Sequence, residues 1–150
     1  MLMRNKLFIL AMTFSSSTAI AGSWANESDL TAHIAYTSSS GGAARLMVDF
    51  AFGNQCGPEV VVRMDAAKLA ASDEPLVLQV DQRKQHPTKL LSLGDELVLA
   101  SFTENTDEIL KDLKAGNKVR VSVKEHSAQF SLSGSSAALA YAQRRCESLQ

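Results

Sequence analysis

The chain has 150 residues, with 15 lysines and arginines against 16 aspartates and glutamates, and 45% of its residues are hydrophobic. This length suits a single domain, since domains most often have about 100 to 150 residues, and the apolar content excludes a disordered chain. The formal net charge of −1 provides no basic footprint for nucleic acid, whose binding domains usually have a pI above about 9.

The first 21 residues have the pattern of a secretory signal peptide. Two positive charges, Arg4 and Lys6, precede an apolar run, and Ala19-Ile20-Ala21 supplies the small residues that signal peptidase requires. The segment turns polar at residues 15–18, too early for the roughly 20 apolar residues of a membrane-spanning helix. We therefore expect cleavage after Ala21 and a single periplasmic or secreted domain over residues 22–150, with no integral membrane segment.

Both cysteines, Cys56 and Cys146, lie in the mature region. In an oxidising compartment an even pair is expected to form one disulfide. A reactive thiol pair and a pair of metal ligands are the alternatives. Neither a C-x-x-C motif nor an adjacent histidine supports them.

The first half of the mature chain predicts antiparallel hairpins. Leu46, Val48, Phe50 and Phe52 share one face of a strand over 45–52. The Gly/Asn/Pro-rich turn that follows holds Cys56, which is therefore expected at or near a hairpin tip. Further strands are expected over 31–36, 59–64, 75–81, 89–93 and 96–102, with turns or loops over 37–42 and 83–88.

The pattern changes to a helical period over 104–114. Asn105 and Glu108 have the spacing of a capping box, and Gly116 is expected to end this helix as its C-cap. Lys118 to Lys124 then alternates as a strand, with three valines on its inner face, and a turn leads into a strand over 128–133.

The last segment predicts a helix that Ser135 or Ser136 caps. Leu139, Ala142 and Cys146 fall within its apolar stripe. The predicted fold class is α+β: an antiparallel sheet or small sandwich of about seven strands, with the C-terminal helix packed on it and one disulfide.

The sequence predicts no catalytic, cofactor or metal site. His33, His86 and His126 are far apart, whereas a zinc site needs three or four converging ligands. There is no G-x-S-x-G nucleophile elbow and no glycine-rich phosphate loop. We therefore expect a protein that is not an enzyme and needs no cofactor.

One concentration of charge stands out on the last hairpin. Lys118, Arg120 and Lys124 lie on the outward face of its first strand. A solvated face is one interpretation, and a patch that docks an acidic partner or an anionic envelope surface is the other.

The last third of the chain resembles two families of small exported proteobacterial proteins. The segment Phe130-Ser131-Leu132-Ser133-Gly134, the helix with its Ala138-Leu139 pair, the terminal Cys146 and the earlier Cys56 carry the resemblance. It is similar to the type VI secretion accessory proteins of the VasI/TagO kind and to the invasion-associated locus B family. The resemblance implies a non-catalytic envelope protein with a disulfide-linked, β-rich domain.

The leading functional hypothesis is a periplasmic or secreted accessory protein that acts through protein-protein contacts, in secretion or host interaction. The alternative is an inhibitor of an envelope or exogenous hydrolase such as lysozyme. In that case an exposed loop, Thr37 to Gly42 or Arg83 to Thr88, would plug the active site of the hydrolase.

Overall fold

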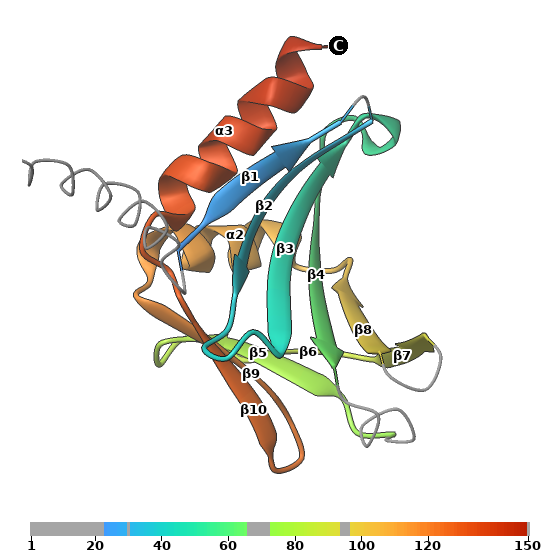
Figure 1. Cartoon of the computed structure of the whole chain (residues 1–150), viewed down its shortest axis with the longest axis vertical. Coiled ribbons are helices and arrows are strands. Elements are labelled where there is room, and N and C mark those ends of the chain that lie inside the picture. The colour runs from blue at the N-terminus through green and yellow to red at the C-terminus, as the bar shows by residue number, and fades with distance from the viewer. Residues whose placement is uncertain (1–22, 30, 66–72, 94–96, 150) are drawn as a thin grey trace, which may run out of the picture.

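In the computed structural model the described residues are 23–29, 31–65, 73–93 and 97–149. They form ten strands in two antiparallel sheets and two α-helices (Figure 1). The α+β class, the C-terminal helix on the sheet and the single disulfide are confirmed. The predicted signal peptide, residues 1–21, lies outside the described residues.

One sheet has six strands in the order β1-β2-β3-β4-β8-β7. Their bounds are β1 Ala25–Ser28, β2 Ala32–Ser38, β3 Ala44–Ala51, β4 Pro58–Asp65, β7 Leu90–Leu93 and β8 Leu97–Phe102. The other sheet has four strands in the order β10-β9-β5-β6. They are β5 Leu76–Val80, β6 His86–Thr88, β9 Lys118–Val123 and β10 His126–Ser131, and the helices are η2 Phe52–Asn54, α2 Thr106–Ala115 and α3 Ser135–Ser148.

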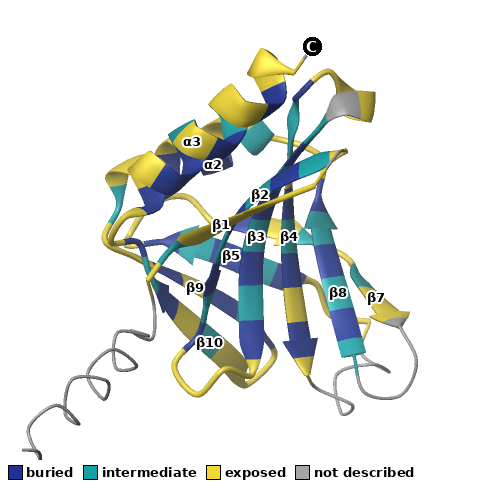
Figure 2. Ribbon diagram, turned by 45° about the horizontal axis from the view of Figure 1, so that its top comes forward, coloured by how far each residue is buried: buried dark blue, intermediate teal, exposed yellow. Residues whose placement is uncertain are grey.

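The alternation of side chains places one apolar face of each sheet in a common core. Val48 on β3 lies opposite Ala35 on β2 and Val60 on β4, and all three are fully buried. Buried and partly exposed residues alternate along these strands in Figure 2. Helix α3 packs against β1, β2 and β3, and α2 packs against α3 and β4, so the helices close the core beside the two sheets.

Two short strands have no pattern in the sequence. β1 has no alternation of apolar and polar residues, and all four of its residues are exposed. It is held by side chains at long range, because the Asn26 amide donates a hydrogen bond to the Ala138 carbonyl of α3 at 2.9 Å. The predicted loop at 83–88 ends in β6, whose central residue is Pro87; proline is tolerated there because β6 is an edge strand.

The N-terminal caps of both helices were predicted incorrectly. Asn105 has left-handed φ of 58° and makes no side-chain capping bond within the described chain. A capping side chain normally requires an extended backbone at this position, which explains the difference. Gly134, with φ of 85°, precedes α3, and the Ser135 hydroxyl instead donates a 2.6 Å hydrogen bond to the Leu113 carbonyl at the end of α2.

Gly116 follows α2 as predicted, but its conformation is extended, with φ −87° and ψ −179°. Close packing requires glycine here, because an added Cβ would lie 2.2 Å from Cγ1 of the buried Val80. We expect Gly116→Ala to lower the free energy of unfolding by about 1 to 3 kcal/mol, as overpacking does. Urea denaturation measures this change.

Gly53→Ala is the matched control, since no described atom lies within 4 Å of its added Cβ and its φ is not positive. It should change stability by no more than about 0.5 kcal/mol. Equal effects of the two substitutions would contradict the close approach of Gly116 to Val80.

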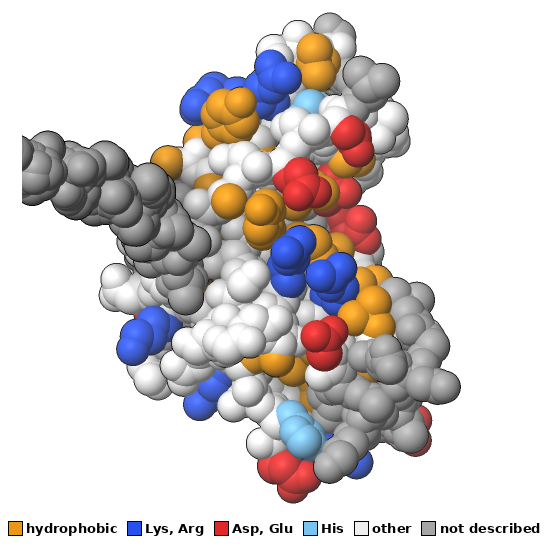
Figure 3. All heavy atoms as spheres, in the orientation of Figure 1, with side chains coloured by type: hydrophobic (Ala, Val, Ile, Leu, Met, Phe, Trp, Pro, Cys, Tyr) orange, Lys and Arg blue, Asp and Glu red, His pale blue; other side chains and the backbone are white. Residues whose placement is uncertain are grey.

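The outer face of the six-stranded sheet is visible in Figure 3. The helices and the other sheet pack against its inner face, so in the described part of the chain nothing is stacked on the outer one. Its side chains are half-buried rather than buried, as the alternating burial of β2 and β3 shows.

Candidate functional site

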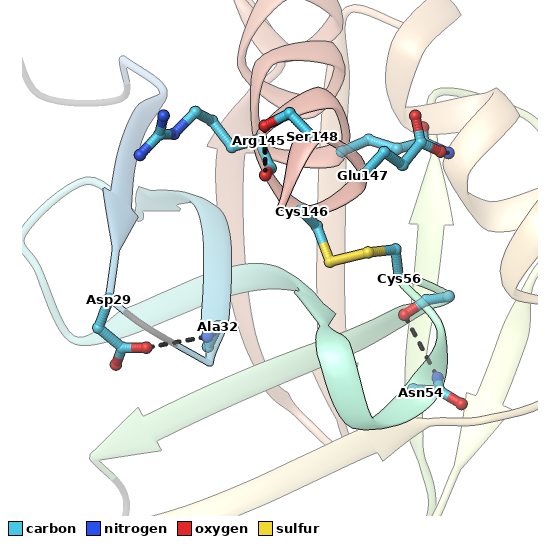
Figure 4. The surroundings of a disulfide bond; sticks show 10 residues. Asp29, Ala32, Asn54, Cys56, Arg145, Cys146, Glu147 and Ser148 are labelled. Carbon is cyan, nitrogen blue, oxygen red and sulfur yellow. Dashed lines mark hydrogen bonds between the residues drawn. A yellow bond between two sulfur atoms is a disulfide. The ribbon is translucent and has the colours of Figure 1, made fainter. Parts of the chain in front are cut away.

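The disulfide joins the β3–β4 hairpin to the last turns of α3 (Figure 4). Cys56 lies just after η2 at the hairpin tip, as predicted, and Cys146 lies on the buried stripe of α3 with Leu139 and Ala142. Both cysteines are buried and their sulfurs are bonded, so the pairing excludes the thiol and metal-ligand alternatives for this state. The cysteines therefore act as a structural link.

The three histidines lie at separate places. His33 is fully buried on β2, His86 is buried on β6, and His126 is exposed at the start of β10. Within the described ranges no group of three or more histidine, cysteine or acidic side chains could hold a metal ion. In the same residues no helix is both long and apolar enough to cross a membrane.

His86 belongs to a charged cluster between β6 and α2. Its Nε2 lies 3.7 Å from Oδ2 of Asp112 and 4.0 Å from Oε1 of Glu108. Arg83 pairs with Asp112 at 3.2 Å, and Lys84 with Glu108 at 3.5 Å. The carboxylates of α2 are thus matched by cations from the β5–β6 connection, so the cluster ties this connection to the helix.

The loops of the inhibitor hypothesis are also tied down. Ser39, in the first, is buried; its N–H donates to the Ala44 carbonyl at 2.9 Å and its hydroxyl accepts the Ala44 N–H at 3.1 Å. In the second, the Arg83 N–H donates to the Val80 carbonyl at 2.9 Å, and the segment ends as β6. These contacts anchor both loops, while residues 40–42 of the first and 83–85 of the second stay exposed.

The structure brings together two of the three residues of the predicted patch. Lys118 and Arg120 lie on the outer face of β9 and line one hollow of about 270 Å³. Lys124 lies beyond the strand, in the β9–β10 turn, with φ of 53°. Because a strand rises about 3.3 Å per residue, it is roughly 13 Å from Arg120, so it is not part of this hollow.

Three glutamines that no local sequence pattern singles out complete the hollow. Arg120 lies directly opposite Gln79 on β5 and Gln129 on β10, and Gln82 also lines the hollow. The outward positions of β9 were predictable from its alternation, but the pairing of β5 beside β9 crosses some 40 residues of intervening chain. A local pattern does not contain this pairing.

Asp81 supplies the carboxylate at the edge of the hollow. It has a left-handed φ of 50° and accepts the backbone N–H groups of Asn117 and Lys118, each at 3.0 Å. These two bonds hold the pKa of Asp81 below its ordinary value. The carboxylate is thus directed to the start of β9. The Gln79 amide donates to the Arg83 carbonyl at 2.8 Å, and among the described residues Lys118 and Arg120 form no ion pair, so their cationic groups are the donors for an incoming acid.

This geometry defines a small α+β domain, disulfide-linked, with a cationic and amide-rich hollow on one sheet. The fold is also that of a solved structure, invasion-associated protein B from Bartonella henselae, with a TM-score of 0.58 and 17% sequence identity. The match covers 87% of this chain and 96% of that chain. No protein-family model and no curated protein sequence matches the chain.

The similarity supports the resemblance to the invasion-associated locus B family at the level of the fold. It does not support the resemblance to the type VI secretion accessory proteins. At 17% identity it carries no residue of one protein over to the other.

Proposed function

We propose that this chain is an extracytoplasmic, non-enzymatic accessory protein that binds an acidic protein partner in host interaction or secretion. The observation that carries the proposal is the hollow on the four-stranded sheet, where Lys118 and Arg120 lie among three glutamines. Cationic and amide donors grouped on one face attract and orient carboxylates on a partner. The buried disulfide supports an oxidising compartment, and the name of the Bartonella protein supports a role in host interaction.

The charge-reversed variant Lys118→Glu/Arg120→Glu tests this proposal. Immobilised wild-type protein is expected to capture, from periplasmic extract or from host-cell extract, a partner with an acidic surface. The variant should retain at least roughly tenfold less of it, because like charges then face each other. Quantitative mass spectrometry of the eluates measures the ratio, and elution should occur at moderate salt, which screens exposed charges.

Arg144→Glu/Arg145→Glu is the matched control, because it makes the same change in net charge on exposed positions of α3. It should capture the partner as well as the wild type does. If the two double variants lose the partner equally, net charge rather than the hollow governs binding. If the wild type captures no acidic partner, the proposed function is wrong.

A further inference from the structure

The outer face of the six-stranded sheet carries its charges in two separate rows. Arg45 on β3 lies directly opposite Arg63 on β4, and further along the same strands Asp49 lies directly opposite Glu59. Like charges in directly opposite positions destabilise a sheet. A single copy of the chain therefore holds two unfavourable pairs, of opposite sign, on one face.

An apolar row separates the two charged rows. It consists of Tyr36, Met47 and Val61, which are cross-strand neighbours and half-buried. The Arg45 guanidinium lies 4.7 Å from the centroid of the Tyr36 ring, a cation-π contact that holds it on this face. Figure 3 shows acidic side chains on one side of hydrophobic ones and a basic pair on the other.

Within the described part of the chain, the charges of both rows form no ion pair with a group of opposite sign. Among the described residues neither Arg45 nor Arg63 forms an ion pair. Asp49 has one buried oxygen that no described donor reaches, and burial, then the neighbouring Glu59, raises the pKa of Asp49 above its ordinary value. Glu59 accepts a hydrogen bond from the Ser101 hydroxyl at 2.5 Å, and this hydroxyl is a neutral partner.

We propose that a second copy of this chain packs on this face, about a two-fold axis that runs along the apolar row. A rotation of 180° about this axis brings the two outer faces together and reverses the strand direction. Each residue then lies over the same strand of the second copy, but on the other side of the apolar row. Arg45 therefore faces Asp49 of the second copy, Arg63 faces its Glu59, and the apolar rows pack on each other.

The match depends on spacing that the register fixes. Each arginine and the acid on its own strand lie four residues apart, at equal distances from Met47 on β3 and Val61 on β4. A two-fold interface must be complementary to itself, and each contact then occurs twice. The four intermolecular ion pairs would compensate all four charges of the two unfavourable pairs in each copy.

The interface is small, since it covers only the middle strands of one sheet, so we expect weak and reversible association. Such interfaces bury less than about 1,200 Å². At a protein concentration on the order of 100 μM and low salt, sedimentation equilibrium of the disulfide-bonded protein should show a monomer-dimer equilibrium. High salt should weaken it.

Two single variants test the pairing. Arg63→Glu places a carboxylate over Glu59 of the second copy, and Glu59→Arg places a guanidinium over its Arg63. Each variant should weaken self-association at least roughly tenfold. Each variant also removes an unfavourable pair within its own sheet. In Arg63→Glu, Arg45 lies opposite an acid, and in Glu59→Arg, Asp49 lies opposite a base. Both variants should therefore fold, which thermal unfolding verifies.

An equimolar mixture of the two variants is the decisive sample. In a dimer of one copy of each variant, position 63 of either copy faces a side chain of opposite charge at position 59 of the other. The mixture should therefore form dimers although each variant alone is monomeric. Lys124→Glu, in the turn of the other sheet, should associate as the wild type does. A monomeric wild type, undiminished association of either single variant, or a monomeric mixture would each overturn the proposal.

Discussion

Replacing both cysteines, in the variant Cys56→Ala/Cys146→Ala, is expected to lower the free energy of unfolding by about 4 to 5 kcal/mol. The link closes a loop with a sequence separation of 90, and without it the unfolded chain regains the entropy of that loop. Alanine places no polar group in the buried space that the two sulfurs leave. Urea denaturation of the oxidised protein and of the variant measures the difference.

Reduction provides the control for this prediction. A reductant should lower the midpoint of the wild type toward that of the double variant and should leave the variant unchanged. Intact mass after alkylation without reductant should show no label on the wild type. If the wild type and the variant unfold at the same denaturant concentration, the disulfide makes no net contribution.

Leu139→Ala is expected to cost about 2 to 5 kcal/mol. Leu139 is fully buried in the stripe by which α3 packs on the sheet, so the substitution leaves a cavity in the common core. Since Cys146 lies in the same stripe, the intact disulfide limits how far α3 can move to close this cavity. Thermal and urea unfolding of the oxidised protein measure the loss.

Tyr141→Ala is the matched control on the same helix. Tyr141 is 45% exposed, so its truncation should change stability by no more than about 0.5 kcal/mol. A cost for Leu139→Ala as small as that for Tyr141→Ala would show that α3 is not part of the cooperative core.

Much of the fold follows from local patterns in the sequence. The alternation of Leu46, Val48 and Phe50 places β3 and the face that it buries, and the three valines of β9 do the same for the second sheet. The strand β3 ends at Ala51 rather than Phe52, because η2 begins there and carries the chain into the turn of Cys56.

Other elements depend on tertiary contacts that no local pattern contains. β1 has no buried residue, and contacts with distant parts of the chain hold it in place. The Ser135 hydroxyl donates its hydrogen bond to α2 instead of capping its own helix. Only the position of α2 in the fold makes this bond possible. The glutamines beside Arg120 likewise become neighbours only when β5 and β10 pair with β9.

His33 is a local exception within a consistent core. It occupies a fully buried position opposite Phe50, and neither ring nitrogen has a hydrogen-bond partner among the described residues. Alternation predicts the inward position but not the polar residue there. A buried polar group without a partner costs stability, and the physical reason for a histidine at this place is not apparent in its contacts.

Two hydrogen bonds tie the beginning of the described chain, at Trp24 and in β1, to its C-terminal part. The Trp24 indole donates to the Ser131 carbonyl, and the Asn26 amide donates to the Ala138 carbonyl, across sequence separations of 107 and 112. Contacts between such distant segments form slowly, because a long loop must close first. β1 can pair with β2 early, but these two hydrogen bonds can form only when the last strand and the last helix are available. A growing chain therefore completes the attachment of its first described strand only after its last strand and its last helix have been synthesised.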